Sequence, residues 1–174
     1  MSKKDRIVFV ATAAMMVAGN FRTEWGVTCG CPWWHHLTFH FVHGNIFHFA
    51  VNLLVLWVYC HNVSFRTKDW LMAFATATAV SFLIPTSTPL VGLSGILMYL
   101  YGLLLPMIWG NRKARLTTYA FIIVSIASLW FNQAAAVLFH AICTLLGVAY
   151  TKTKDLIYDI KDQEERTHRR GTGG

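Results

Sequence analysis

Four polar residues within apolar stretches of the sequence have types and spacings that suit acyl-transfer chemistry. Ser94 stands in a Gly-Leu-Ser-Gly run that begins at Gly92, and His140 lies inside a later apolar stretch. His48 and Asn52 are four residues apart, so on a helix they share one face. A serine, a histidine and a pair of N–H donors are the parts of a serine hydrolase site. The sequence therefore predicts a buried hydrolytic site to which three segments contribute.

Each of these residues is assigned a role in that chemistry. Ser94 would attack a carbonyl group while His140 acts as general base, taking the hydroxyl proton and giving it to the leaving amine. His48 and Asn52 would donate hydrogen bonds to the oxyanion, together with backbone N–H groups at the start of the Ser94 helix. Gly92 would let a backbone or a substrate carbonyl come close.

Structural roles for the same residues stay open. Ser94 could be an N-cap, and His140 could bond a backbone carbonyl. His48 and Asn52 could hold their helix to its neighbours. His43, which stands ahead of that helix, is expected chiefly to brace the adjoining loop.

The composition places these groups in a membrane protein. The chain of 174 residues is 55% hydrophobic and 13% charged, with a mean hydropathy of +0.45. Residues 70–111 and 116–151 contain no Asp, Glu, Lys or Arg, and such tracts are typical of lipid-solvated segments. The net charge of +7 comes from short links and tails without a basic, aromatic-rich helix face, so we expect no nucleic-acid partner.

The pattern predicts an all-α membrane protein, a bundle of six transmembrane helices with a long interfacial loop between helices 1 and 2. We expect spans near residues 7–21, 44–60, 70–84, 93–109, 117–131 and 134–150. The corresponding divisions are a cytoplasmic leader (1–6), a six-helix domain (7–150) and a charged cytoplasmic tail (151–174). A cleaved signal peptide at the N-terminus is the alternative for the first apolar run.

The distribution of basic residues predicts the orientation. Fourteen of the fifteen Lys and Arg residues fall in the leader, the tail and the links after spans two and four; Arg22 is the exception. By the positive-inside rule both termini are cytoplasmic, in a multi-pass protein of the cell membrane. The candidate site then lies in the outer half of the bilayer. Only Glu24 among the acidic residues is expected on that side, which predicts a Ser-His dyad without a third carboxylate.

In combination, these residues resemble the rhomboid family of intramembrane serine proteases. The resemblance covers residues 7 to 150 and rests on His43-Gly44, His48, Asn52, Gly92-Leu93-Ser94-Gly95, His140 and Gly147. It implies a nucleophile at Ser94 and a base at His140. It also implies oxyanion support from His48 and Asn52, and cleavage of single-pass membrane proteins within their transmembrane segments, without a metal ion or other cofactor.

Three positions depart from the family's usual pattern. Trp34 is followed by His35 where an arginine usually anchors the loop, so that anchor is missing or replaced. Met98 stands where a tyrosine commonly stacks on the base histidine, although Tyr99 is next to it. Cys143 replaces a glycine in the last span, which weakens the expected close helix packing without abolishing it.

Two functions other than proteolysis are compatible with parts of the sequence. A catalytically inactive rhomboid-like protein would keep the fold and bind membrane helices without cutting them. A metal-binding membrane protein could use the histidines at 35, 36, 40, 43 and 48, but such sites prefer paired histidines with nearby carboxylates. Cys29 and Cys31 are spaced poorly for a mutual disulfide or a metal, so we expect neither a metal nor a cofactor.

Overall fold

The apolar stretches of the sequence form helices that surround α5. The computed structural model describes residues 1–19, 22–63, 65–113, 115–116, 118–119 and 134–171, with side chains through 156. The longer helices are α1 (Lys3–Ala18), α3 (Ile46–Asn62), α4 (Thr67–Ser81), α5 (Ser94–Ile108) and α7 (Ala134–Gly171). Between α1 and α3, residues 22–45 form the long loop, which carries the short helices η1 (Thr23–Trp25), α2 (His35–Thr38) and η2 (Phe39–Phe41).

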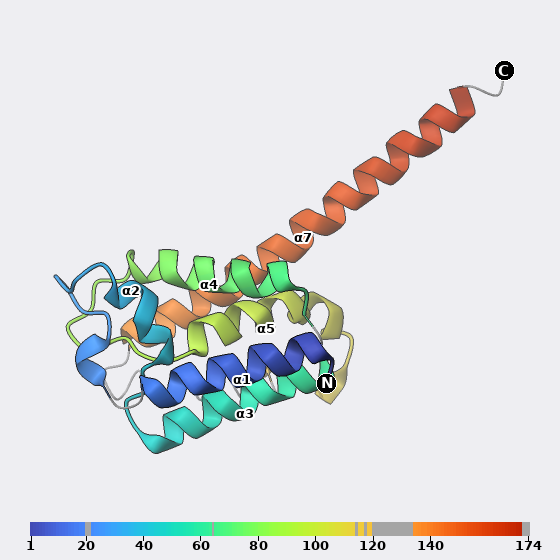
Figure 1. Cartoon of the computed structure of the whole chain (residues 1–174). Helices are drawn as coiled ribbons and strands as arrows, with labels where there is room; N and C mark the ends of the chain where they lie inside the picture. The colour runs from blue at the N-terminus through green and yellow to red at the C-terminus, as the bar shows by residue number, and fades with distance from the viewer. Residues whose placement is uncertain (20–21, 64, 114, 117, 120–133, 172–174) are drawn as a thin grey trace.

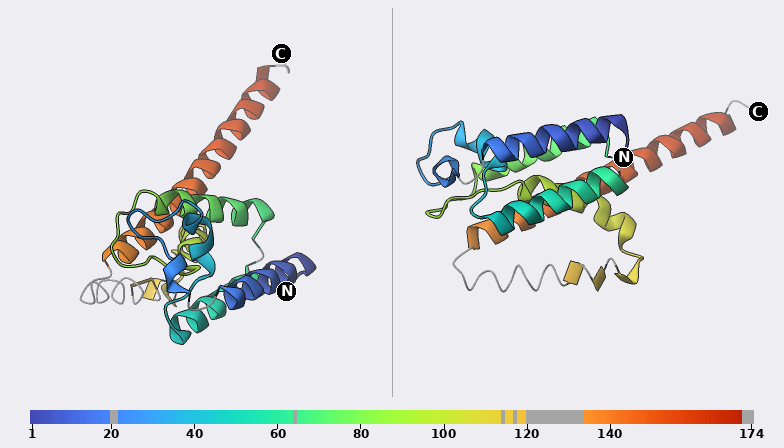
Figure 2. Two further views of the ribbon diagram at one scale, coloured as in Figure 1. Left: turned by 60° about the vertical axis from the view of Figure 1, so that its left-hand side comes forward. Right: turned by 60° about the horizontal axis from the view of Figure 1, so that its bottom comes forward.

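Helix α5 occupies the middle of the bundle and makes its most extensive contacts with α7 (Figure 1). Helix α4 packs against both of them, and α1 lies beside α3. The long loop lies at one end of the bundle. The N-terminus and the projecting part of α7 lie at the other end, as Figure 1 and the right-hand view of Figure 2 show.

Two glycines allow α5 and α7 to touch through their backbones. A Cβ atom added at Gly102 would lie 3.0 Å from Gly147 Cα and would overlap the Thr144 carbonyl oxygen. One added at Gly147 would overlap the Tyr99 carbonyl oxygen. Cys143 is fully buried on the same side of α7. The predicted small-residue contact therefore forms despite this cysteine, and it forms at backbone distance.

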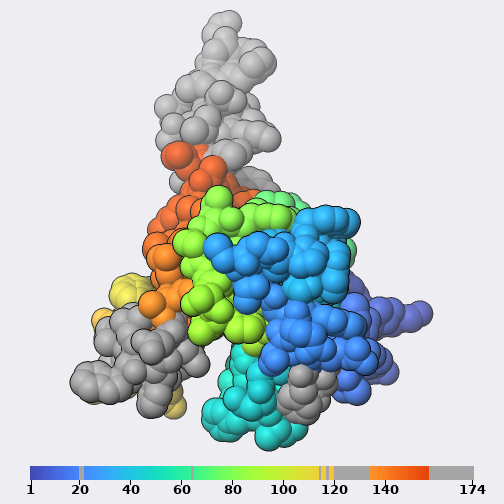
Figure 3. Space-filling model, turned by 90° about the vertical axis from the view of Figure 1, so that its left-hand side faces the viewer, coloured from blue at the N-terminus to red at the C-terminus, as the bar shows by residue number. Residues whose placement is uncertain are grey.

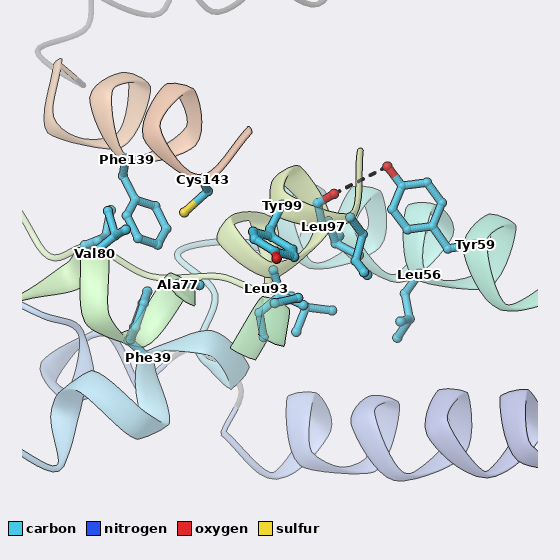
Figure 4. Packing of buried hydrophobic residues seen from close by; sticks show 14 of the residues in the cluster. Phe39, Leu56, Tyr59, Ala77, Val80, Leu93, Leu97, Tyr99, Phe139 and Cys143 are labelled. Atoms are coloured by element: carbon cyan, nitrogen blue, oxygen red, sulfur yellow. Dashed lines mark hydrogen bonds between the residues drawn. The ribbon is translucent and has the colours of Figure 1, made fainter. Parts of the chain in front are cut away.

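Aromatic side chains fill the space between the long loop and these helices. Phe39, fully buried, lies close to Phe139 of α7, with 5.8 Å between ring centroids, and Ala77 and Val80 of α4 are buried alongside (Figure 4). Gly95 makes room for Phe139, because a Cβ atom at Gly95 would overlap the phenyl ring. The core thus extends up to the residue that precedes His140.

The described helices agree only partly with the six predicted spans. By length and hydropathy, Ala134–Leu156 is long and apolar enough to cross a membrane. A second span results if His35–Phe41 and Ile46–Asn62, which meet at 85°, are counted as one broken segment; Ser94–Ile108 is apolar but shorter. Helices also occur at the first and third predicted spans. The predicted fifth span, apart from residues 118–119, and the short turn expected after it at 132–133 lie outside the described residues.

Helix boundaries differ from the predicted ones in one important place. The last span is predicted to end near Tyr150 and to be followed by a charged tail of which only the start is helical, yet α7 continues without a break to Gly171. The residues after Tyr150 are largely Lys, Asp, Glu and Arg, which are compatible with a helix in water. The loss of hydropathy at this point therefore does not mark the end of the helix.

Candidate active site

Ser94 and His140 are brought together from two helices. Ser94 is the first residue of α5, and His140 lies in the second turn of α7. His140 Nε2 stands 2.7 Å from Ser94 Oγ, which is hydrogen-bonding distance. Both residues are half-buried. Leu93, not Ser94, is the N-cap residue of α5, so the serine hydroxyl is not used as a helix cap.

The start of α5 also supplies hydrogen-bond donors. The first backbone N–H groups of a helix have no acceptor four residues earlier within the helix, and they carry the positive end of the helix dipole. Ser94 therefore stands where a developing negative charge is stabilised. Among the described residues no carboxylate bonds His140, which leaves the pair as a serine–histidine dyad.

His48 and Asn52 border the same region through Gly92. Gly92 has φ +111°, and a Cβ atom added there would lie 2.7 Å from the His48 ring and 3.6 Å from Asn52 Nδ2. Both side chains thus reach the backbone two residues before Ser94, as their shared helix face predicts. Asn52 is 4% exposed, and its amide donates to the His48 carbonyl oxygen at 2.9 Å. One amide proton remains for a substrate oxyanion.

His43 is buried behind His48 at the entrance to α3. Its ring centroid lies 5.1 Å from that of His48 and 5.5 Å from that of Phe49. Burial, with the neighbouring His48 ring, lowers the pKa of His43 to about 4, so this imidazole is neutral at pH 7. These contacts suit the bracing role that the sequence suggested for it.

The loop that leads to Ser94 is held by backbone hydrogen bonds from the long loop. Val27 and Leu90 exchange two N–H···O bonds of 3.0 and 2.9 Å, and the Gly92 N–H donates to the Phe39 carbonyl oxygen at 2.9 Å. Figure 3 shows the long loop and residues 82–93 side by side on this face, next to the start of α7. The segment that precedes Ser94 is therefore held in place by hydrogen bonds to the long loop.

Histidines anchor the long loop in place of the arginine that the family pattern leads one to expect. His35 Nδ1 lies 3.0 Å from the Gly26 carbonyl oxygen. His36 and His40 contact hydroxyl groups of α4, at Ser81 and Thr78 respectively. The sequence indicated that the usual anchor at His35 is missing or replaced, but it suggested His36 and His40 only as metal ligands, and their contacts in the loop were not predicted. Their partners are 38 and 45 residues away, so no local spacing reveals the contacts.

The aromatic ring near His140 does not come from position 98 or 99. Tyr99 faces Tyr150, with 6.5 Å between ring centroids, whereas the ring beside His140 is that of Phe139 at 6.0 Å. Met98 packs at the edge of the core.

Within the described part of the chain, no three His, Cys, Asp or Glu side chains come together as a metal site requires.

Comparison with known proteins identifies the family. A family model for the Rhomboid domain matches residues 30–153, and the chain belongs to the rhomboid family. It is accordingly an integral membrane protein. Comparisons with curated proteins and with solved structures give no match. The family contains intramembrane serine proteases and inactive homologues, and the matched range includes all the residues of the candidate site.

Proposed function

We propose that this protein is an intramembrane serine endopeptidase that cleaves transmembrane segments of other membrane proteins. The observation that carries the proposal is the 2.7 Å approach of His140 Nε2 to Ser94 Oγ, made between residues 46 positions apart. A serine hydroxyl that instead served a purely structural role would be expected to cap its helix, and Leu93 has that position. Membership in the rhomboid family supports the same chemistry.

The reaction follows from the positions of these groups. Ser94 Oγ attacks the scissile carbonyl carbon, and neutral His140 accepts the hydroxyl proton at Nε2. The resulting oxyanion is stabilised by N–H groups at the start of α5 and by the side chains of His48 and Asn52. His140 then gives its proton to the leaving amine as the C–N bond breaks. A water molecule then attacks the acyl carbon and gives a proton to His140, and His140 passes that proton to Ser94 Oγ as the ester bond breaks and the carboxylic acid product leaves.

For the fold, we propose a six-span bundle with the long loop at the outer membrane surface and both termini in the cytoplasm. The N-terminus and the projecting end of α7 lie at the end opposite the long loop (Figure 1). Fourteen of the fifteen basic residues then lie on the cytoplasmic side. Large exposed apolar side chains on α1, α3, α4 and α7 suit contact with lipid; examples are Ile7, Leu54, Leu71 and Leu145.

A fluorophosphonate probe in proteoliposomes tests the proposal. Wild-type protein should be labelled and should cleave a single-pass transmembrane substrate, and Ser94→Ala should do neither. Ser87→Ala, which changes an exposed serine in the preceding loop, is the matched control and should behave as wild type. Folded wild-type protein with neither labelling nor cleavage would contradict the proposal and favour an inactive membrane-helix-binding homologue.

A further inference from the structure

Phe39, in the middle of the long loop, contacts the immediate surroundings of both members of the dyad. Its carbonyl oxygen accepts the Gly92 N–H at 2.9 Å, two residues before Ser94. Its ring stands edge-on to Phe139, the residue before His140, with 5.8 Å between centroids. The side chain is fully buried (Figure 4). A shift of Phe39 would therefore be transmitted to Ser94 and to His140 at once.

Two histidines fasten the loop to α4 on either side of Phe39. His36 Nδ1 lies 2.8 Å from Ser81 Oγ, and its ring stacks on Phe82 with 3.6 Å between centroids and 13° between planes. His40 is fully buried, and its Nε2 lies 3.0 Å from Thr78 Oγ1. The two hydroxyl groups are three residues apart, so they lie on one face of α4.

A neutral His36 carries one ring proton, and the hydrogen bonds of Ser81 indicate which ring nitrogen holds it. The Ser81 hydroxyl donates to the Thr78 carbonyl oxygen at 2.6 Å, so its oxygen accepts from His36 and the imidazole carries its proton on Nδ1. Nε2 is then an acceptor, and Cys31 Sγ lies 3.7 Å from it, within reach for a thiol donor. A continuous series of hydrogen bonds thus leads from the loop into α4.

We infer that His36 and His40 are positioning residues: by holding the long loop on α4 they keep Phe39 where it aligns Ser94 with His140. The inference rests on the proposed function, because it concerns the rate of that reaction. Neither histidine touches the dyad, and both act through Phe39. Loss of either anchor frees the loop backbone next to Phe39, and a misplacement of about 1 Å can reduce a rate by up to about 100-fold.

The first test removes each hydrogen bond and keeps a ring of similar size. His36→Phe and His40→Phe should lower kcat at least about tenfold, leave KM within about twofold, and slow fluorophosphonate labelling of Ser94 in parallel. His61→Phe is the matched control, because His61 is exposed at the far end of α3 and, among the described aromatic rings, stacks on Trp57 alone. That variant should keep the wild-type kcat.

Rescue by the conservative variant separates positioning from general stability. Asn can place an N–H donor near the His36 Nδ1 position, and Gln can place an amide group, which both donates and accepts, near the His40 Nε2 position. His36→Asn and His40→Gln should therefore recover most of the lost kcat. If a Phe variant does not fold, Ser81→Ala and Thr78→Val remove the partners from α4 without altering the loop, and they should give the same fall in kcat.

The outcomes distinguish this inference from the proposed function. If wild-type protein is labelled and cleaves substrate while the Phe variants and the α4 variants keep kcat within twofold, the positioning role is wrong and the protease assignment stands. A fall in kcat that Asn and Gln do not recover, or that His61→Phe shares, also overturns it. If wild-type protein is neither labelled nor active, both proposals fail together.

Discussion

Gly102 of α5 and Gly147 of α7 meet so closely that neither can carry a side chain without moving a helix. The contact lies two turns beyond His140 along α7. It sets the separation of the two helices that carry the dyad. A methyl group at Gly147 would overlap the Tyr99 carbonyl oxygen, which belongs to the backbone and cannot rotate away.

We therefore expect Gly147→Ala to lower the free energy of unfolding by about 1–3 kcal/mol, the usual cost of overpacking, and to reduce cleavage. Gly110→Ala is the control, since a Cβ atom there meets no atom within 4 Å. Thermal unfolding in detergent and the cleavage rate measure the two effects. Wild-type values for Gly147→Ala would contradict the close helix contact.

Replacing the general base should abolish turnover without unfolding the protein. His140→Ala should lose about 10⁴-fold or more in kcat, and combining it with Ser94→Ala should cost little more, since members of a catalytic pair act as a unit. Initial-rate measurements in proteoliposomes, with unfolding curves alongside, provide the check. Full turnover by His140→Ala would show that another group accepts the serine proton.

Asn52 should affect the rate more mildly than the dyad. Asn52→Ala removes one oxyanion donor, for which we expect a loss of about 10²–10³ in kcat. Asn52→Asp should be slower still, because a carboxylate places negative charge beside the oxyanion. Measurement of kcat checks this expectation: wild type should be fastest, Asn52→Ala slower and Asn52→Asp slowest. Equal rates for the two variants would argue that the side chain serves only its bond to the His48 carbonyl oxygen.

The substrate should be cut where its helix opens easily. A helical peptide bond is shielded by its own hydrogen bonds, so the segment must unwind before Ser94 can attack. We expect small P1 residues and nearby helix breakers to favour cleavage, and leucine or β-branched residues at P1 to slow it. A P1 scan of one transmembrane substrate, followed by mass spectrometry of the products, measures this. Uniform rates across the scan would count against the expected unwinding.

The contact between Ser94 and His140 could be predicted from the sequence, whereas the loop contacts around it could not. His48 and Asn52 are linked by helical periodicity, and Ser94 by the glycines around it, so local patterns suffice for these residues. The pairing of Ser94 with His140 needed the combination of motifs. By contrast, the contacts of His36 and His40 join a loop to a helix through single hydrogen bonds across 45 and 38 residues. Neither periodicity nor hydropathy contains that information.

Helix lengths illustrate a second limit. Hydropathy predicted an apolar span that ends near Tyr150 but not how far α7 continues, because a helix of charged residues can persist in water through its own propensities. The predicted spans and the observed helices differ by a few residues elsewhere, for example at α3, expected from Gly44 and found from Ile46. Asn45 decides that boundary, since its side chain accepts the His48 N–H at 2.8 Å.

Helix α7, which carries His140, extends well beyond the bundle (Figure 1). Its 38 residues span about 57 Å at 1.5 Å per residue, nearly twice the roughly 30 Å of a bilayer interior. His140 and the projecting end belong to the same rod (Figure 1). A protein or membrane surface that binds the free end would therefore contact the same continuous helix that carries His140.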